Sequence, residues 1–269
     1  MTGREPTDLM HYGIHLAASG ALTSLYRQDV LANNLANIDT VGFKPEIVAT
    51  QARATARDED GLGTLPSNEL LERLGGGMMS APNRIDFGQA ALNTTGNSLD
   101  LAIRGEGFFL VEERGTDGGS FLRLTRDGRF TLNDDGRLVM ATTGLNVLDD
   151  AGRPIRLEDD AGIAIASDGL MTQNGEEIAK LAIVDVPDRT RLSKRGAGLL
   201  NAPAEAIQSR STASGLVVQG AVEASGVSDI NTMLSVTSAG RAAAGNLAVI
   251  GYHDRMMDQA VNRLGRITG

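Results

Sequence analysis

Apolar residues recur every three or four positions from Asp8 to about Ile38. This spacing places them on one side of a helix, because an α-helix turns once every 3.6 residues. The residues of this stripe are Ile14, Ala18, Ala21, Leu25, Leu31, Leu35 and Ile38. Asp8 is a candidate N-cap, and Gly42 is a natural stop beyond the end. The pattern therefore predicts one long amphipathic helix.

The C-terminal segment repeats this pattern, with the polar Asp254 as its one interruption. Its apolar positions are Met233, Val236, Gly240, Ala243, Leu247, Ile250, Met257, Val261 and Leu264. Steps of three and four residues make a heptad-like seam, and several of its members are small enough to let another helix approach closely. We expect the two terminal helices to pack as a coiled-coil-like pair, or to pack on other copies of the chain.

From about Leu99 the hydrophobic period changes to two, which is typical of β-strands. The stretch "LDLAIRGEGFFLVEE" reads as a strand interrupted by a glycine turn. Strong turn signals occur at Asp127-Gly128 and Asp135-Gly136, and they predict two hairpins in series. Two further hairpins are predicted in the same way at Asp168-Gly169 and Asn174-Gly175. We expect an antiparallel β domain of many short strands.

The remaining segments show no sustained period. Residues 45–80 have the composition of loops, with a short helix expected near residues 70–74, and residues 188–215 are expected to form a loop that returns to the C-terminal helix. The predicted fold is α+β, in four parts. These are an N-terminal helical assembly domain (1–44), an extended connector (45–98), a central antiparallel β domain (99–215) and a C-terminal helical assembly domain (216–269).

Composition excludes several classes of function. The net charge is −9 and no basic stripe occurs, so nucleic acid is not an expected partner. The absence of cysteine rules out disulfides and thiolate metal sites. No run of about 18 apolar residues exists, which predicts no membrane-spanning helix. The N-terminal residues mix charges of both signs, and from this we expect no cleaved signal peptide.

Candidate catalytic groups are sparse. His11 and His15 share a helix face, but Tyr12 stands where a zinc protease needs glutamate, and no third ligand is evident. Adjacent carboxylates are more typical of turns and of opposite strand faces than of a catalytic pair; they occur at Glu112-Glu113, Asp134-Asp135, Asp149-Asp150 and Asp159-Asp160. We expect no enzyme activity and no catalytic, cofactor, metal or small-molecule site. A hydrolase or an extracellular binding module built on the β domain remain as alternatives.

One N-terminal stretch, "LANNLANIDTVGFK", closely resembles the signature of the flagellar rod and hook protein family of bacteria. The matching positions are Ala32, Asn33, Asn34, Leu35, Ala36, Asn37, Thr40, Gly42, Phe43 and Lys44. Three later stretches resemble further elements of the family in the expected order: "TTGNSLDLAIRGEGFFLV", "LTRDGRFTLNDDGRLV" and "VQGAVEASGVSDINTML". The resemblance covers nearly the whole chain.

The resemblance implies a structural subunit of the flagellar basal body. Such subunits are exported unfolded by the flagellar type III apparatus and polymerise helically into the rod that crosses the periplasm. Their partners are copies of themselves and other rod and hook proteins. The length is similar to that of the distal and proximal rod proteins, with a hook-type axial protein as the alternative. The C-terminal helix departs from the family, because Gly226, Gly240-Arg241, Ala243 and Ala244 replace the usual larger or more polar residues.

The resemblance also identifies an assembly motif, which comprises Asn33, Asn34, Leu35, Asn37, Thr40, Gly42 and Phe43. Asparagine is a mediocre helix former, so three of them near the end of one helix suggest a specific role. Asn33 and Asn37 share a helix face, and we expect them to set register between neighbouring subunits, as a buried asparagine does in a coiled coil. Gly42 and Phe43 are expected to turn and anchor the chain beyond the helix.

Overall fold

The structure, a computed structural model, describes residues 7–55, 75–115, 119–158 and 162–264. It divides into two compact units. The helical unit comprises Met1–Leu35, Glu46–Arg84 and Asp229–Gly269, and the β unit comprises Ala36–Pro45 and Ile85–Ser228. An N-terminal helix, a C-terminal helix and a mostly antiparallel β domain confirm the α+β class.

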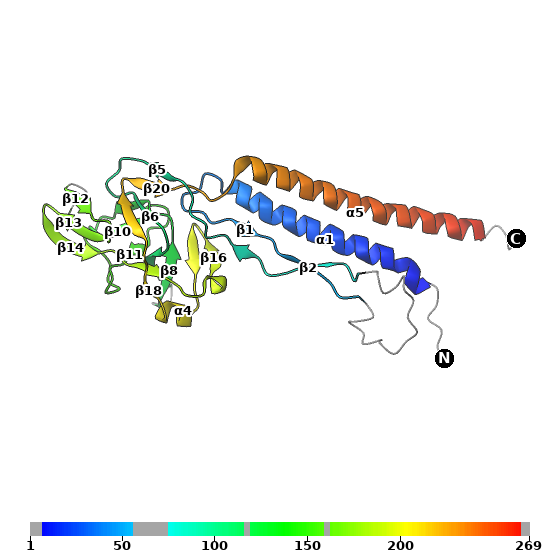
Figure 1. Ribbon diagram of the computed structural model, residues 1–269, viewed down its shortest axis with the longest axis horizontal. Coiled ribbons are helices and arrows are strands. Elements are labelled where there is room, and N and C mark those ends of the chain that lie inside the picture. Colours follow the sequence, from blue (N-terminus) through cyan, green and yellow to red (C-terminus); the bar gives the residue numbers. More distant parts are fainter. Residues whose placement is uncertain (1–6, 56–74, 116–118, 159–161, 265–269) are drawn as a thin grey trace. The chain divides into compact units, whose positions relative to one another are not determined.

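The helical unit contains two long helices, α1 (Thr7–Ala36) and α5 (Asp229–Leu264), which lie side by side in Figure 1. A β-carbon built on Gly13 would lie 2.9 Å from His253 Nε2, and one on Gly20 would lie 2.9 Å from Asn246 Nδ2. Positions that advance along α1 therefore meet positions that retreat along α5, so the two helices are antiparallel. Glycine lets them approach closely, because it has no side chain to separate them.

Most of the buried positions in the two helices hold alanine, and Val30 and Asn34 of α1 are buried as well. Ala17 and Ala21 of α1 and Ala239 and Ala243 of α5 are all buried. Among the expected seam residues, Ile14, Ala18, Val236, Ile250 and Met257 are half-buried, and Leu25, Met233 and Leu247 are exposed. The side chains of Val261 and Leu264 lie outside the described part of the chain. The coiled-coil character of the pair stays a prediction.

Residues 46–55 and 75–84 of the helical unit are mainly extended. They contain β1 (Glu46–Ile47), β2 (Thr50–Ala52) and β3 (Met78–Ser80), and β4 (Arg84–Ile85) follows. Strands β2 and β3 pair antiparallel, and all their residues are exposed. A β-carbon on Gly77 would lie 2.5 Å from Ser19 Oγ, so this ribbon runs against α1. The short helix expected near residues 70–74 lies outside the described residues.

The β unit is built around a sheet that has nine strands in the described ranges. Its main path runs in the order β16-β17-β8-β7-β11-β10-β9, and β15 joins β7 to β18. The bounds are β7 (Phe108–Arg114), β8 (Ser120–Thr125), β9 (Phe130–Leu132), β10 (Leu138–Met140), β11 (Asn146–Val147), β15 (Ile183–Asp185), β16 (Ser193–Gly196), β17 (Leu199–Asn201) and β18 (Ser211–Thr212).

Smaller sheets complete the β unit. A three-stranded sheet contains β12 (Ile163–Ile165), β13 (Leu170–Gln173) and β14 (Glu176–Lys180). The C-terminal strands return to pair with strands from much earlier in the chain: β19 (Leu216–Gln219) pairs with β6 (Leu101–Arg104), and β20 (Ala221–Glu223) pairs with β5 (Leu92–Thr94). The β unit is therefore closed by residues that arrive late in the sequence.

Three of the four predicted hairpins are confirmed. They join β9 to β10, β12 to β13 and β13 to β14. Asn174 and Gly175 both have positive φ, at 54° and 91°, as a tight turn that matches the strand twist requires. The hairpin predicted at Asp127-Gly128 is wrong, because β8 pairs with β7 and β17 instead of β9. There the chain turns towards β6, and Gly128 O accepts the Leu101 N–H at 2.9 Å.

The loop expected over residues 188–215 is also wrong. The segment contains the 3-10 helix η1 (Arg189–Arg191), strands β16, β17 and β18, and the helix α4 (Ala204–Gln208). These elements are too short to establish a hydrophobic period, which is why the sequence pattern does not reveal them.

Strand β7 separates the two hydrophobic clusters of the β unit. Phe109 and Val111 belong to one cluster, and Phe108 and Leu110 to the other. This alternation follows from the pleat of the strand, which sends successive side chains to opposite faces. Phe109 meets Phe130 edge-on, with 5.2 Å between ring centroids. Among the described helices, none is long and apolar enough to cross a bilayer.

Candidate functional site

The buried asparagine of the assembly motif binds the backbone of its own chain. Asn34 is only 4% exposed. Its Nδ2 donates to Glu46 O at 2.8 Å, and its Oδ1 accepts the Glu46 N–H at 3.0 Å. The carboxamide thus pairs with one residue as a neighbouring strand would, and it fixes the backbone where the chain resumes beside α1.

The other two asparagines are placed differently. Asn33 is exposed on α1, and Asn37 is half-buried just after the helix ends. Thr40 Oγ1 donates to Asn37 Oδ1 at 3.2 Å, and Ser225 Oγ donates to Asn37 O at 2.9 Å. Asn37 therefore helps to shape the turn within the β unit. Leu35, which lies between them, is half-buried. The role of Asn33 and Asn37 in setting the register between subunits stays a prediction.

Gly42 occupies a position that only glycine fits. Its φ is +66°, in the left-handed region, and its N–H donates to Glu223 O at 2.8 Å. A β-carbon here would lie 2.4 Å from the carbonyl carbon of Arg126. That neighbour is backbone and cannot rotate away, so both the conformation and the space demand glycine.

Phe43 continues the same segment and is buried. Its ring lies 4.0 Å from Lys194 Nζ, a cation–π contact, and its carbonyl accepts the Gly226 N–H at 2.9 Å. Two segments therefore lie hydrogen-bonded together on the β unit. We name them the N-terminal connection (residues 40–45) and the C-terminal connection (residues 221–226).

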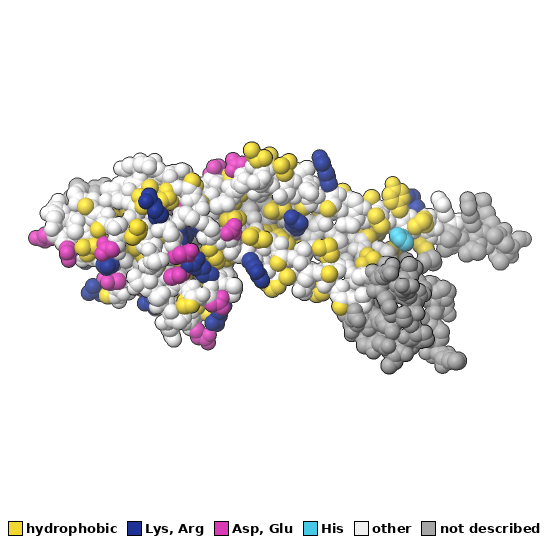
Figure 2. All heavy atoms as spheres, in the orientation of Figure 1, with side chains coloured by type: hydrophobic (Ala, Val, Ile, Leu, Met, Phe, Trp, Pro, Cys, Tyr) yellow, Lys and Arg dark blue, Asp and Glu magenta, His cyan; other side chains and the backbone are white. Residues whose placement is uncertain are grey.

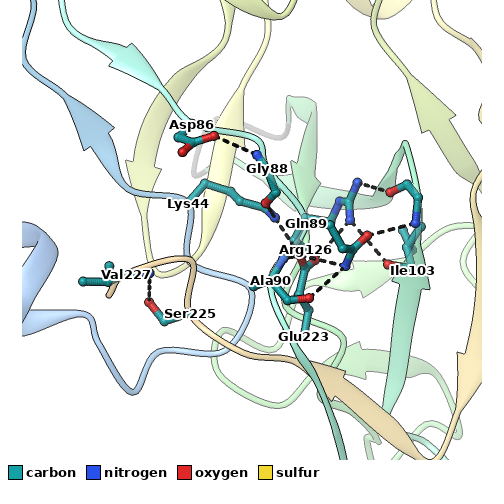
Figure 3. Close-up of polar contacts among 11 residues, drawn as sticks. Lys44, Asp86, Gly88, Gln89, Ala90, Ile103, Arg126, Glu223, Ser225 and Val227 are labelled. Carbon is teal, nitrogen blue, oxygen red and sulfur yellow. Dashed lines mark hydrogen bonds and ion pairs between the residues drawn. The ribbon is translucent and has the colours of Figure 1, made fainter. Parts of the chain in front are cut away.

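Three buried charges lie beside these connections (Figure 3). Lys44 Nζ donates to Glu223 Oε1 at 2.7 Å, and Arg126 Nη1 donates to Glu223 Oε2 at 3.1 Å. The side chains of Lys44 and Arg126 are 3% exposed, and that of Glu223 is fully buried. Glu223 Oε1 also accepts the Ala90 N–H at 2.9 Å and Gln89 Nε2 at 3.0 Å. We name Lys44, Arg126 and Glu223 the charged cluster.

Backbone carbonyls satisfy further donors of the charged cluster. Lys44 Nζ donates to Gly88 O at 2.8 Å, and Arg126 Nη2 donates to Gly105 O at 2.8 Å. Burial lowers the pKa of the Lys44 ammonium, and the hydrogen bond to Glu223 opposes that shift. Two cations share one carboxylate, so loss of Glu223 would leave two like charges in a buried space, which is costly.

Sequence reasoning missed Arg126 and Glu223. Both lie in stretches that resemble the family, "LTRDG" and "VQGAVEASG". Nothing in their spacing predicts contact with Lys44, because Glu223 lies 179 residues further along the chain. The one signal in the sequence is that Lys44 and Arg126 each lie two residues from a glycine, in segments that are otherwise apolar or typical of turns.

The β unit also contains a cavity of about 400 Å³. Its charged lining residues are Asp150, Asp168, Lys180 and Arg210, and Lys180 pairs with Asp168 at 3.1 Å. From strands β7 to β10 of the main sheet, only Leu110 lines it. No histidine lines the cavity, so the described groups include no imidazole base there. This geometry does not favour the hydrolase alternative.

The other candidate groups have ordinary surroundings. His15 is exposed, and Asp159-Asp160 and the side chain of His11 lie outside what the structure describes. Glu112 accepts Ser120 Oγ at 2.8 Å, and Glu113 accepts both Arg123 and Arg195. Across residues 7–55, 75–115, 119–158 and 162–264, no group of three or more potential metal ligands occurs.

Comparison with known proteins finds matches to two separate parts of the chain. Residues 14–44 match the family model described as flagella basal body rod protein, and residues 102–186 match the flagellar hook protein FlgE/F/G D1 domain. The chain is 30% identical to the flagellar basal-body rod protein FlgF of Caulobacter vibrioides, covering 96% of this chain and 100% of that one. It is 32% identical to FlgF of Rhizobium meliloti (95% and 99% covered). It is 29% identical to the rod protein FlgG of Bacillus subtilis (93% and 97% covered).

Proposed function

Because this chain belongs to the flagellar basal-body rod protein family and is a structural subunit of the rod, we propose that it polymerises through its terminal helices. The observation that carries this proposal is the apolar surface of the helical unit. Leu22 is 68% exposed on α1, and Ile230 is 73% and Leu234 65% exposed on α5. Large apolar side chains gathered at a surface are typical of sites that bind other proteins.

The exposed apolar residues continue along both helices. On α1 they are Leu22, Leu25 and Tyr26, and on α5 they are Ile230, Met233, Leu234, Leu247, Val249, Tyr252 and Met256. Figure 2 shows hydrophobic side chains reaching the surface over the helical unit, whereas acidic side chains in this view gather mainly over the β unit. A surface of this kind on a subunit with a second, different contact face builds an open helical polymer, because the contact is heterologous and does not close.

The expected coiled-coil packing fits the same proposal. The helices α1 and α5 approach at Gly13 and Gly20, and alanines of both helices are buried. Larger side chains such as Met233 and Leu247 remain exposed and are available to neighbouring subunits. Asn33 is exposed on α1, which suits the proposed register contact. The N-terminal (1–44) and C-terminal (216–269) parts form the assembly domain, with residues 45–98 as connector and 99–215 as the β domain.

The proposal places the subunit in the rod that crosses the periplasm, with the terminal helices in the inner tube and the β domain outside. Its partners are copies of itself and other axial proteins of the rod and hook. Export proceeds in the unfolded state through the flagellar type III apparatus. The subunit acts as a building block and not as an enzyme.

Cysteine cross-linking tests the polymer contact, since the natural chain has no cysteine. Single cysteines at Leu22, Leu234 or Met256 are introduced into the full chain, and basal bodies are labelled at the cysteine with a benzophenone maleimide and irradiated, which links the labelled position to whatever side chain lies against it. We expect cross-linked species that contain two axial subunits. A cysteine at Asp134, in an exposed turn of the β unit, is the control and should stay uncross-linked. Absence of cross-links from all three helix positions would contradict the proposal.

A further inference from the structure

The charged cluster joins three parts of the chain that are far apart in sequence. Arg126 lies 97 residues before Glu223, and Lys44 lies 179 residues before it. Of the three, Glu223 is the last to be synthesised. The cluster is therefore complete only when most of the chain is available.

Glu223 holds both connections through its side chain and its backbone. Its carboxylate binds Lys44 of the N-terminal connection, and its carbonyl accepts the Gly42 N–H. It also ends β20, which pairs with β5. Three residues further on, Gly226 N donates to Phe43 O. One residue thus fixes the two chain segments to the β unit and to each other.

The two connections contribute nothing to the hydrophobic clusters of the β unit. Both clusters are built from residues between 85 and 217, and neither includes a residue of 40–45 or 221–226. Phe43, Ala221 and Val222 of the connections are buried, but outside both clusters. The attachment of the connections therefore depends on these three side chains, the charged cluster and a few backbone hydrogen bonds. Elements packed outside a hydrophobic core can open locally while the core stays folded.

We propose that Lys44, Arg126 and Glu223 form a latch that holds residues 40–45 and 221–226 on the β unit and opens while the hydrophobic clusters remain folded. The latch closes because Glu223 neutralises two buried cations, and it stays open without that carboxylate because Lys44 and Arg126 repel each other. Asp86 also faces Lys44, but it is exposed and binds the Gly88 N–H, so it does not replace Glu223. Glu223 is a positioning residue for both connections.

Hydrogen exchange of the purified full-length chain tests the latch. The Gly42 and Gly226 amides report on the connections, and the Leu138 and Leu148 amides, bonded to Ile155 O and Leu110 O, report on the core. In Glu223→Gln we expect exchange at the two glycines to accelerate roughly a hundredfold, with the core amides changed by less than about threefold. Adding Lys44→Met to Glu223→Gln removes one unpaired cation and should recover about tenfold of that acceleration.

Glu113→Gln is the matched control, because Glu113 also binds two arginines but on the surface. It should leave all four amides unchanged. Equal acceleration of connection and core amides in Glu223→Gln would overturn the proposal, since the cluster would then be an inseparable part of the core. Unchanged exchange at Gly42 and Gly226 would overturn it as well. If Glu223→Gln does not fold, Lys44→Met alone decides between the same outcomes, with about tenfold acceleration expected at the two glycines.

Discussion

Gly42 lies against the backbone of Arg126 so closely that a β-carbon on Gly42 would be 2.4 Å from the Arg126 carbonyl carbon. This contact explains the glycine of the family signature in terms of packing between segments that lie far apart in the chain. Two residues after Gly42, Lys44 forms its ion pair with Glu223. The signature residues Gly42, Phe43 and Lys44 therefore dock on the β unit as one segment.

Gly42→Ala should destabilise the β unit by about 3 kcal/mol or more, because it adds backbone strain to an overlap that cannot relax. Gly144→Ala is the control: its φ is +70°, but nothing lies within 4 Å of its β-carbon position. That change should cost only about 1 kcal/mol. Urea unfolding followed by the phenylalanine bands of the near-ultraviolet circular dichroism spectrum measures both, because all six phenylalanines lie in the β unit and all three tyrosines in the helical unit. Equal losses would show that strain alone, and not the contact with Arg126, demands glycine.

Asn34→Ala should lower the unfolding free energy of the helical unit by about 1–3 kcal/mol, because it leaves the N–H and carbonyl of Glu46 without their side-chain partner. Far-ultraviolet circular dichroism during thermal unfolding reports on this unit, which contains the long helices. The exposed Asp29 of the same helix provides the control, and Asp29→Ala should change the free energy by less than about 0.5 kcal/mol. A similar loss in both variants would refute the intrachain role of Asn34.

Two glycines of the helices should respond in opposite directions. Gly20→Ile should destabilise the helical unit by about 1–3 kcal/mol, since even a β-carbon would lie 2.9 Å from Asn246 Nδ2. Gly245→Ala should stabilise it by about 0.5–1 kcal/mol, because nothing lies within 4 Å and alanine is the better helix former. Thermal melting at 222 nm measures the difference. Tolerance of isoleucine at position 20 would mean that α1 and α5 do not pack there in solution.

Glu112 should contribute a pH-dependent part of the stability of the β unit. The hydrogen bond from Ser120 lowers the pKa of Glu112, and Asn146 and Arg114 act in the same direction. A carboxyl with a lower pKa in the folded state stabilises above its unfolded pKa and loses that effect as pH falls through the folded pKa. Glu112→Gln should therefore cost about 0.5 kcal/mol at neutral pH and less in acid. A constant difference between the two proteins at every pH would exclude this linkage.

Local patterns in the sequence predicted much of the fold. The 3.6-residue period placed α1 and α5, and Asp-Gly or Asn-Gly turns placed three hairpins. The same reasoning failed at Asp127-Gly128, because a turn signal does not show whether the strands before and after the turn pair with each other. The helix pattern placed Ala21 and Ala243 on the seams, and both are buried. It also placed Met233 and Leu247 there, which are exposed, and left out Ala239, which is buried.

The charged cluster could not be predicted from sequence for a different reason. Its members come together because β20 pairs with β5. This pairing joins segments that are far apart in the chain, and no periodic pattern in the sequence indicates it. A single buried glutamate is indistinguishable by composition from the many exposed ones. The resemblance to a family marked the stretches that contain Lys44, Arg126 and Glu223, and only the fold showed that these stretches meet.

The central claim, that this chain is a subunit of the flagellar rod, is tested most directly by electron microscopy of basal bodies from a strain that lacks its gene. The account predicts truncated rods without hooks and loss of motility, both restored by the natural chain supplied from a plasmid. Complete hook–basal bodies of normal rod length in the deletion strain would contradict it.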